Sequence, residues 1–156
     1  MTSQASPHLI SLLESLSEEI ALQQFPAGAL YVVATPIGNI ADISLRALSV
    51  LERVDAIACE DTRTTGQLLK RYGLSKQLIA THQHNEAAAS QRIVERLRQG
   101  ERVALISDAG TPAISDPGTR VVDAVLNEGL IAIPIAGPSA AIAALSASGL
   151  SGTGFR

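Results

Sequence analysis

The sequence predicts an α/β protein built on a five-stranded, mostly parallel sheet with helices on both faces. Three observations predict this class. From residue 29 onward, short apolar runs that fit buried strands alternate with stretches whose apolar residues recur at helical spacing. Glycines at the ends of several helical stretches act as stop signals. Of the 156 residues, 46% are hydrophobic and 17% are charged, enough apolar material for the core of one ordinary domain.

Residues 1–28 differ from the rest in charge, because they hold three glutamates and no lysine or arginine. Apolar residues between Leu9 and Leu22 recur at roughly helical spacing after a weakly polar start. We expect this segment to be an appended helix or a partly disordered arm.

Five apolar runs are the candidate strands, and all are short, as strands buried on both faces usually are. They are residues 30–34, 56–59, 78–81, 103–106 and 130–135. The fourth is the clearest and the third the weakest. Because a helical stretch separates each pair of runs, the connections are crossovers and the strands are expected to be parallel.

The first three helices between these runs are marked by caps and glycine stops. Ser44 caps a helix with a leucine stripe, and the next helix runs from about residue 62 to Gly73. Asn85 can cap a third helix, which Gly100 ends.

Two more helices follow the fourth and fifth strands. Asp116 and Pro117 supply an N-cap and a first-turn proline for a helix that ends at Gly129. Pro138 and Ser139 open a last helix that runs through residue 145.

Composition excludes several classes of protein. Four aromatic residues and no tryptophan are too few for a platform that stacks successive nucleic-acid bases. The longest uncharged run, 27 residues after Glu128, is broken by Pro134, Gly137 and Pro138 into pieces too short to span a bilayer. With no secretory signal and a single cysteine, we expect a cytoplasmic protein without a membrane segment.

Metal binding is not expected either. His82 and His84 stand two residues apart with Glu86 beyond them, but no cysteine and no third histidine lies near. Cys59 lies inside an apolar strand, where we expect it to be a core residue.

Unusual residues concentrate in the loops that follow the candidate strands. These loops are residues 35–39, 60–63, 82–86, 107–118 and 136–139. In open parallel sheets, ligands bind outside the carboxyl ends of the strands. The loops at the opposite edge are plainer, mostly a glycine followed by ordinary residues. The sequence therefore predicts a ligand site at the carboxyl edge.

The loop chemistry favours a cationic or zwitterionic small molecule over a nucleoside triphosphate. No Gly-x-Gly-x-x-Gly follows the first strand, and no Gly-Lys-Ser or Gly-Lys-Thr occurs. Glycines let backbone groups approach a ligand, and carboxylates can pair with an ammonium group or a ribose diol. In the alternative reading, Asp116 only caps its helix and Asp108 only stabilises a turn.

Residues 62–98 carry a local charge excess of +5, although the whole chain has a net charge of −3. Such an excess suits either a phosphate-facing patch formed by two neighbouring helices or an ordinary solvated face. The candidate patch residues are Arg63, Lys70, Arg71, Arg92, Arg96 and Arg98.

Five ordered motifs make the chain resemble the tetrapyrrole-methylase-like superfamily over residues 30–149. They are Ala-Thr-Pro-Ile-Gly-Asn at 34–39, Cys-Glu-Asp-Thr-Arg at 59–63, His-Asn-Glu at 84–86, the 107–118 loop and Gly-Pro-Ser-Ala at 137–140. Corrinoid and porphyrin methylases carry Gly-x-Gly-Pro-Gly-Asp after the first strand. Here Asn39 stands where that aspartate would be, which favours the ribosomal-RNA branch of the superfamily.

The resemblance implies a methyltransferase that uses S-adenosylmethionine and methylates the ribose 2′-hydroxyl of a cytidine in the 16S RNA of the small ribosomal subunit. It also implies that residues 29–152 are the N-terminal domain of a two-domain homodimeric protein, with 153–156 starting a linker to a second domain absent from this chain. By motif, the residues that would contact the methyl donor are Thr35, Pro36, Gly38, Asn39, Ser107, Asp108, Ala109, Gly110, Thr111, Pro112, Asp116, Gly118, Gly137, Pro138, Ser139 and Ala140.

Catalysis of such a transfer requires in-line positioning and a group that takes the hydroxyl proton late. Glu60, Asp61 and His84 are the candidate proton acceptors, and Arg63 is the candidate for holding a phosphate. A tetrapyrrole or corrinoid C-methyltransferase and a non-catalytic small-molecule-binding module are the alternatives. The chain is acidic overall, and the resemblance implies that a second domain is absent, so we expect this fragment alone to bind RNA weakly and not to methylate it.

Overall fold

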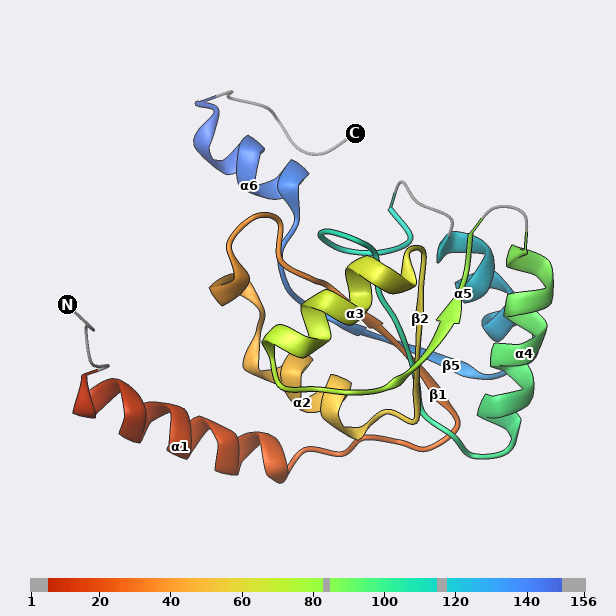
Figure 1. The fold of residues 1–156 in the computed structure, drawn as a ribbon, viewed down its shortest axis with the longest axis horizontal. Coiled ribbons are helices and arrows are strands. Elements are labelled where there is room, and N and C mark those ends of the chain that lie inside the picture. The colour runs from red at the N-terminus through yellow and green to blue at the C-terminus, as the bar shows by residue number, and fades with distance from the viewer. Residues whose placement is uncertain (1–5, 83–84, 115–117, 150–156) are drawn as a thin grey trace.

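The computed structural model describes residues 6–82, 85–114 and 118–149, and in them all five predicted strands form. The strands are β1 (Ala29–Val33), β2 (Ala56–Cys59), β3 (Gln77–Ala80), β4 (Val103–Leu105) and β5 (Ile131–Ile135). They pair only in parallel, in the order β3-β2-β4-β1-β5 (Figure 1). The predicted fold class is confirmed, and the strand order places β4 between β1 and β2.

Helices cover both faces of this sheet because the crossovers run in two directions. From β1 the chain moves toward the β3 edge through α2 (Leu45–Arg53) and α3 (Thr62–Arg71). It returns toward β5 through α4 (Glu86–Arg98) and α5 (Gly118–Asn127). Right-handed crossovers that run in opposite directions place their helices on opposite faces.

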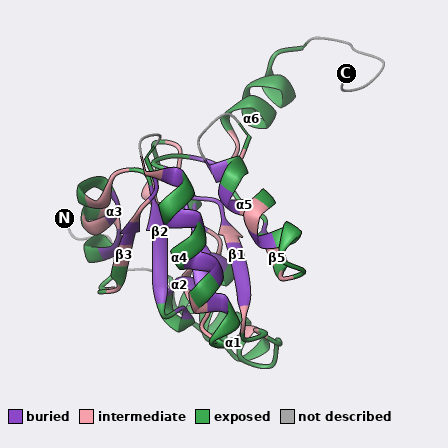
Figure 2. Ribbon diagram, turned by 90° about the vertical axis from the view of Figure 1, so that its right-hand side faces the viewer, coloured by how far each residue is buried: buried purple, intermediate pink, exposed green. Residues whose placement is uncertain are grey.

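Two hydrophobic clusters, one on each face, form the core. Tyr31 and Ile57 pack with α2 and α3 on one face, whereas Leu30 and Leu105 pack with α4 and α5 on the other. Successive residues of a strand point to opposite faces, so every strand residue needs an apolar neighbour on its own side. Figure 2 accordingly shows buried strands between helices whose outer sides are exposed.

Helix starts match the sequence prediction in part. Ser44 caps α2 as expected, its Oγ accepting from the Ala47 N–H at 3.0 Å. Asn85 is the N-cap residue of α4 as predicted, but its side chain makes no capping hydrogen bond. With φ near −123° and ψ near 5°, its backbone is not extended, and its Nδ2 donates to the carbonyl of Ala80 at 3.0 Å. Asp116 lies outside the described residues.

Two helices at the ends of the chain have no buried residue. α1 (Pro7–Ala21) is a formed helix that contacts α2, so the helical alternative for the N-terminal segment is the correct one. α6 (Ala140–Ala147) is exposed throughout. Both stand away from the sheet in Figure 1. In the described part of the chain, no helix combines the length and apolar character that crossing a membrane requires.

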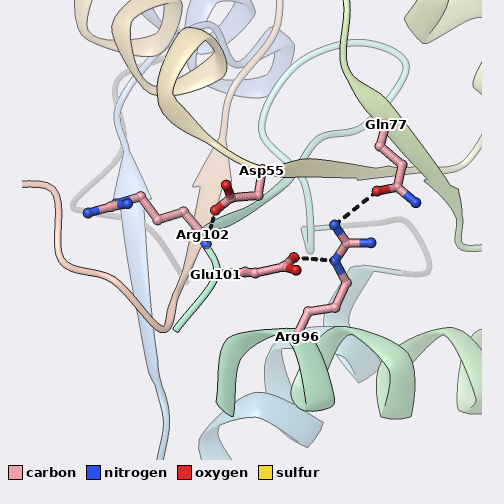
Figure 3. A network of polar contacts seen from close by, with 5 residues as sticks. All are labelled: Asp55, Gln77, Arg96, Glu101 and Arg102. Atoms are coloured by element: carbon pink, nitrogen blue, oxygen red, sulfur yellow. Dashed lines mark hydrogen bonds and ion pairs between the residues drawn. The ribbon is translucent and has the colours of Figure 1, made fainter. Parts of the chain in front are cut away.

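The amino-terminal edge of the sheet is held by polar side chains (Figure 3). Arg96 on α4 donates to Glu101 at 2.5 Å and to the side-chain oxygen of Gln77 at 3.0 Å. The backbone N–H of Arg102 donates to Asp55 at 2.7 Å. These contacts join the loops that precede β2, β3 and β4, and they give this edge a structural role.

Gly66→Ala is expected to stabilise the protein. Gly66 lies inside α3, and a methyl group there would meet no atom within 4 Å. Alanine loses less backbone entropy in a helix, so the free energy of unfolding should rise by about 0.5–1 kcal/mol. Urea denaturation measures the change. Gly73→Ala is the matched comparison and should destabilise, because Gly73 has φ +71°. A loss of stability in the Gly66 variant would contradict the helix position.

Candidate functional site

The loops that follow β1 and β4 are joined at the carboxyl edge of the sheet. Thr35 and Gly110 form an isolated antiparallel bridge beyond the ends of the strands. The N–H of Thr35 donates to Gly110 at 2.9 Å, and the N–H of Gly110 donates back at 3.0 Å. Two loops 75 residues apart in sequence thus become one unit.

The side chain of Thr35 strengthens this junction from inside. The residue is fully buried, and its Oγ1 donates to the carbonyl of Ser107 at 3.1 Å. The Ser107 hydroxyl in turn donates to the Gly110 carbonyl at 3.2 Å. Because the Thr35 hydroxyl is bound to protein carbonyls, we assign it the role of ordering the loops around a ligand.

The loop after β5 joins the same cluster. Thr111 donates its hydroxyl to the carbonyl of Pro138 at 3.0 Å. Gly137 lies so close to β1 that a Cβ there would stand 2.8 Å from the Cβ of Ala34. Gly110 has φ +85°, and a Cβ on it would lie 3.4 Å from Ile37. Glycine is therefore required where the loops cross.

The residues of these three loops that remain exposed define what a ligand can contact. Gly38, Asp108, Ala109 and Gly137 are exposed, and so is Asn39, whose Oδ1 accepts from Ala41 at 3.1 Å. The surface thus offers backbone groups and the Asp108 carboxylate. The contacts of Thr35 with Gly110, of Thr111 with Pro138 and of Gly137 with Ala34 hold the loops after β1, β4 and β5 side by side.

A second group of candidate residues lies at the ends of β2 and β3. Glu60 is exposed and lines a narrow cleft with Thr81, Ser107, Pro112 and Gly118. His84, which is also a candidate proton acceptor, lies outside the described residues. Glu60 is thus the candidate whose carboxyl group lines this cleft.

Asp61 is occupied as the N-cap of α3. Its Oδ1 accepts from the backbone N–H groups of Arg63 at 2.8 Å and Thr64 at 3.4 Å. The hydrogen bond from Arg63 holds the pKa of the Asp61 carboxyl below its ordinary value. A carboxylate with a lowered pKa is a weaker base. The Arg63 side chain is 90% exposed, 3.7 Å from Asp61, and free to turn toward a phosphate.

The stability contribution of the Asp61 charge should depend on pH. A carboxyl with a lowered pKa in the folded state stabilises the protein above its unfolded pKa of about 3.9, and this contribution is lost as pH falls through the folded pKa. Asp61→Asn keeps a capping oxygen but removes the charge. We expect its melting temperature to lie below that of the parent at pH 7 and to converge with it in acid. A difference that stays constant down to pH 2 would contradict the charge assignment.

The single patch, one of the two alternatives for the basic side chains, does not form. α3 carries Arg63, Lys70 and Arg71, but it packs on the opposite face of the sheet from α4. On α4, Arg96 holds Glu101 and Gln77, and Arg98 pairs with Glu128. The crossover direction separates the two helices, because β3, between them in sequence, is the edge strand where the chain turns back.

Glu86 is a residue whose placement the sequence interpretation missed. It is 4% exposed at the start of α4, in line with Ser90, Ile93 and Leu97 on the buried stripe of that helix. The helical spacing of these four residues is the signal that would have found it.

Cys59 is buried as predicted, and burial raises the pKa of its thiol. Among the described residues, no three His, Cys, Asp or Glu side chains are grouped to hold a metal.

A parallel sheet with converging glycine-bearing loops at its carboxyl edge defines the class of open α/β proteins, in which ligands bind at that edge. Residues 29–156 match the tetrapyrrole (corrin/porphyrin) methylases. The chain belongs to this family, and the predicted resemblance is confirmed.

Two curated relatives carry the same name. The chain is 54% identical over 127 residues to the ribosomal RNA small subunit methyltransferase I of Mesorhizobium japonicum. It is 52% identical over 123 residues to the protein of that name from Escherichia coli O157:H7. These matches cover 81% and 79% of this chain but 43% of each relative, so the chain spans less than half of their length.

A solved structure shares the fold. The uroporphyrin-III-C-methyltransferase of Thermus thermophilus superposes with a TM-score of 0.59 at 27% sequence identity. The match covers 80% of this chain and 53% of that one.

Proposed function

We propose that this chain is the N-terminal part of an S-adenosylmethionine-dependent methyltransferase that modifies the RNA of the small ribosomal subunit. The ribose 2′-hydroxyl of a cytidine in 16S RNA is the proposed acceptor. The observation that carries the proposal is the convergence of loops 35–39, 107–112 and 137–140 in a chain more than half identical to relatives of that name.

The loop residues fit the methyl donor. Bound S-adenosylmethionine supplies an activated methyl group on a sulfonium centre. The exposed backbone at Gly38 allows close approach of a nucleoside, because no Cβ stands in the way. The exposed Asp108 carboxylate offers a partner for a cationic group or a ribose diol.

Calorimetry on the 156-residue chain tests the donor assignment. We expect S-adenosylmethionine and S-adenosylhomocysteine to bind and ATP not to bind, because the loops contain no phosphate cradle. Equal or tighter binding of ATP would overturn the donor assignment.

The chain's own residues have two tasks in the transfer. They hold the acceptor in line with the donor, and one of them takes the hydroxyl proton late in the reaction. We propose that Glu60 accepts the proton and that Arg63 holds a neighbouring phosphate. Both are exposed, Glu60 directly after β2 and Arg63 in the first turn of α3. His84 and Asp61 remain the other proposed acceptors.

The RNA assignment is tested on a chain extended to the length of its relatives. Tritiated methyl transfer to small ribosomal subunits is the expected activity. A 2′-O-methylated nucleotide resists alkaline cleavage of its phosphodiester, so label recovered in an alkali-stable dinucleotide identifies the position. Label in mononucleotides would contradict the ribose assignment.

Tetrapyrrole C-methylation is the second candidate, favoured by the likeness to the Thermus thermophilus uroporphyrin-III-C-methyltransferase. Asn39 in place of the aspartate of that branch argues against it. Offering a uroporphyrin-type substrate beside ribosomal subunits in one assay distinguishes the two.

We propose in addition that the complete protein is a cytoplasmic homodimer, with residues 29–152 as its first domain. Sedimentation of the extended chain tests the dimer.

A further inference from the structure

The start of α4 holds two buried oxygen atoms that lack hydrogen-bond partners. Glu86 is 4% exposed, and its Oε2 lies 3.5 Å from Arg120 on α5, whereas its Oε1 has no partner. The preceding residue, Asn85, is oriented by the bond from its Nδ2 to Ala80, which leaves its Oδ1 buried and without a partner. Neither oxygen has a role in the methyl transfer described above.

Their position separates them from the loops that fit the methyl donor. Those loops follow β1, β4 and β5, whereas Asn85 follows β3 at the opposite edge of the sheet. Three strand spacings of about 4.8 Å each place the ends of β3 and β1 about 14 Å apart. The cleft lined by Glu60, Thr81 and Ser107 lies at the strands between them. Glu60 and Thr81 place this cleft on the β3 side of the loops that fit the methyl donor.

The chemistry of the two oxygens selects the group they bind. A carboxylate and an amide oxygen accept hydrogen bonds and donate none. Buried acceptors in folded proteins are nearly always satisfied, and the ion pair with Arg120 accounts for one Glu86 oxygen only. The third unpartnered oxygen in the described chain belongs to Thr65 and lies on the other face, beside the Cys59 thiol. Each of the two oxygens on these consecutive residues therefore lacks a hydrogen-bond donor.

We propose that Asn85 Oδ1 and Glu86 Oε1 accept hydrogen bonds from the exocyclic amino group of the nucleobase that enters the site. Cytosine carries an amino group where uracil carries a carbonyl oxygen. The two acceptors bind the first and repel the second, so they act as a specificity determinant. The inference rests on the proposed RNA substrate and adds the residues that read its base.

Nuclear magnetic resonance on the isotope-labelled 156-residue chain tests this assignment with a matched pair of probes. Cytidine and uridine monophosphates share ribose and phosphate and differ in the base. We expect cytidine monophosphate to shift the backbone amides of residues 85 and 86, and uridine monophosphate to bind there at least about tenfold more weakly. Equal responses to the two nucleotides, or none to either, would overturn the proposal.

Glu86→Gln is the informative variant, because its amide replaces one acceptor with a group that also donates. The preference for cytidine should be lost in this variant. Glu95→Gln, on the exposed side of the same helix, removes the same charge and should keep the preference. If Glu86→Gln does not fold, the comparison of cytidine and uridine monophosphates on the parent chain still tests the proposal.

S-adenosylmethionine serves as the third probe. If it shifts residues 85 and 86 and cytidine monophosphate does not, the oxygens belong to the donor site and the inference is overturned while the proposed function stands. If calorimetry shows no binding of S-adenosylmethionine, the proposed function is what fails.

Discussion

Gly137→Ala should destabilise the protein and weaken its binding of S-adenosylmethionine at least tenfold. The added Cβ would lie 2.8 Å from the Cβ of Ala34, a buried residue directly after β1. Neither methyl group can rotate away, so the β5 loop must shift from β1. Overpacking of this kind costs about 1–3 kcal/mol, and the shift displaces the backbone proposed to hold the donor. Urea denaturation and calorimetry measure the two effects.

A second substitution in the same pair provides the control. Ala34→Gly removes the opposing methyl group, and alone it should cost about 0.5–1 kcal/mol through the added backbone freedom of glycine in the unfolded chain. In the double variant, donor binding should return toward that of the parent. If the double variant is as impaired as Gly137→Ala, contact with Ala34 is not the reason that this position needs glycine.

Thr35→Val should weaken the junction of the β1 and β4 loops. Valine keeps the shape of threonine but removes the hydroxyl that donates to the carbonyls of Ser107 at 3.1 Å and Gly110 at 3.5 Å. The Gly110 carbonyl keeps the Thr35 N–H and the Ser107 hydroxyl as donors, but the buried Ser107 carbonyl loses the Thr35 hydroxyl, which costs about 1–3 kcal/mol. We expect a loss of that size in the free energy of unfolding, with faster amide hydrogen exchange at Gly110.

Thr111→Val is the matched comparison for Thr35→Val. Its hydroxyl donates to Pro138 at 3.0 Å from a half-buried position, where water can replace the lost donor. The expected cost is about 0.5–1.5 kcal/mol, with exchange at Gly110 unchanged. An equal or larger loss at Thr111 would show that the β5 loop, and not the Thr35 junction, stabilises the site.

Much of the site was predictable because its signals are local in the chain. The unusual residues of the five loops at the carboxyl edge, together with the rule that ligands bind at that edge, predicted where the site lies, and the resemblance implied the loops after β1, β4 and β5 as the donor contacts. The structure brings those loops together. The sequence pattern did not show that the Thr35 hydroxyl would turn inward, since that depends on a carbonyl 72 residues away.

What the sequence left open concerns relations between distant elements. The sequence interpretation did not decide whether the basic residues of α3 and α4 share one surface, and the packing of the two helices on opposite faces separates them. It also expected Asn85 to cap α4, because asparagine is a common capping residue. The Asn85 side chain instead donates its Nδ2 to the Ala80 carbonyl at the end of β3.

The order of apolar runs and helical stripes alone determined that this protein is a parallel α/β domain with its unusual loops at one edge, since side-chain periodicity follows from backbone geometry within each element. The strand order β3-β2-β4-β1-β5, the separation of α3 from α4 and the burial of Glu86 were decided only when the elements packed. The physical reason is that the direction of each crossover depends on which faces remain to be covered, and no local pattern of residues encodes that choice.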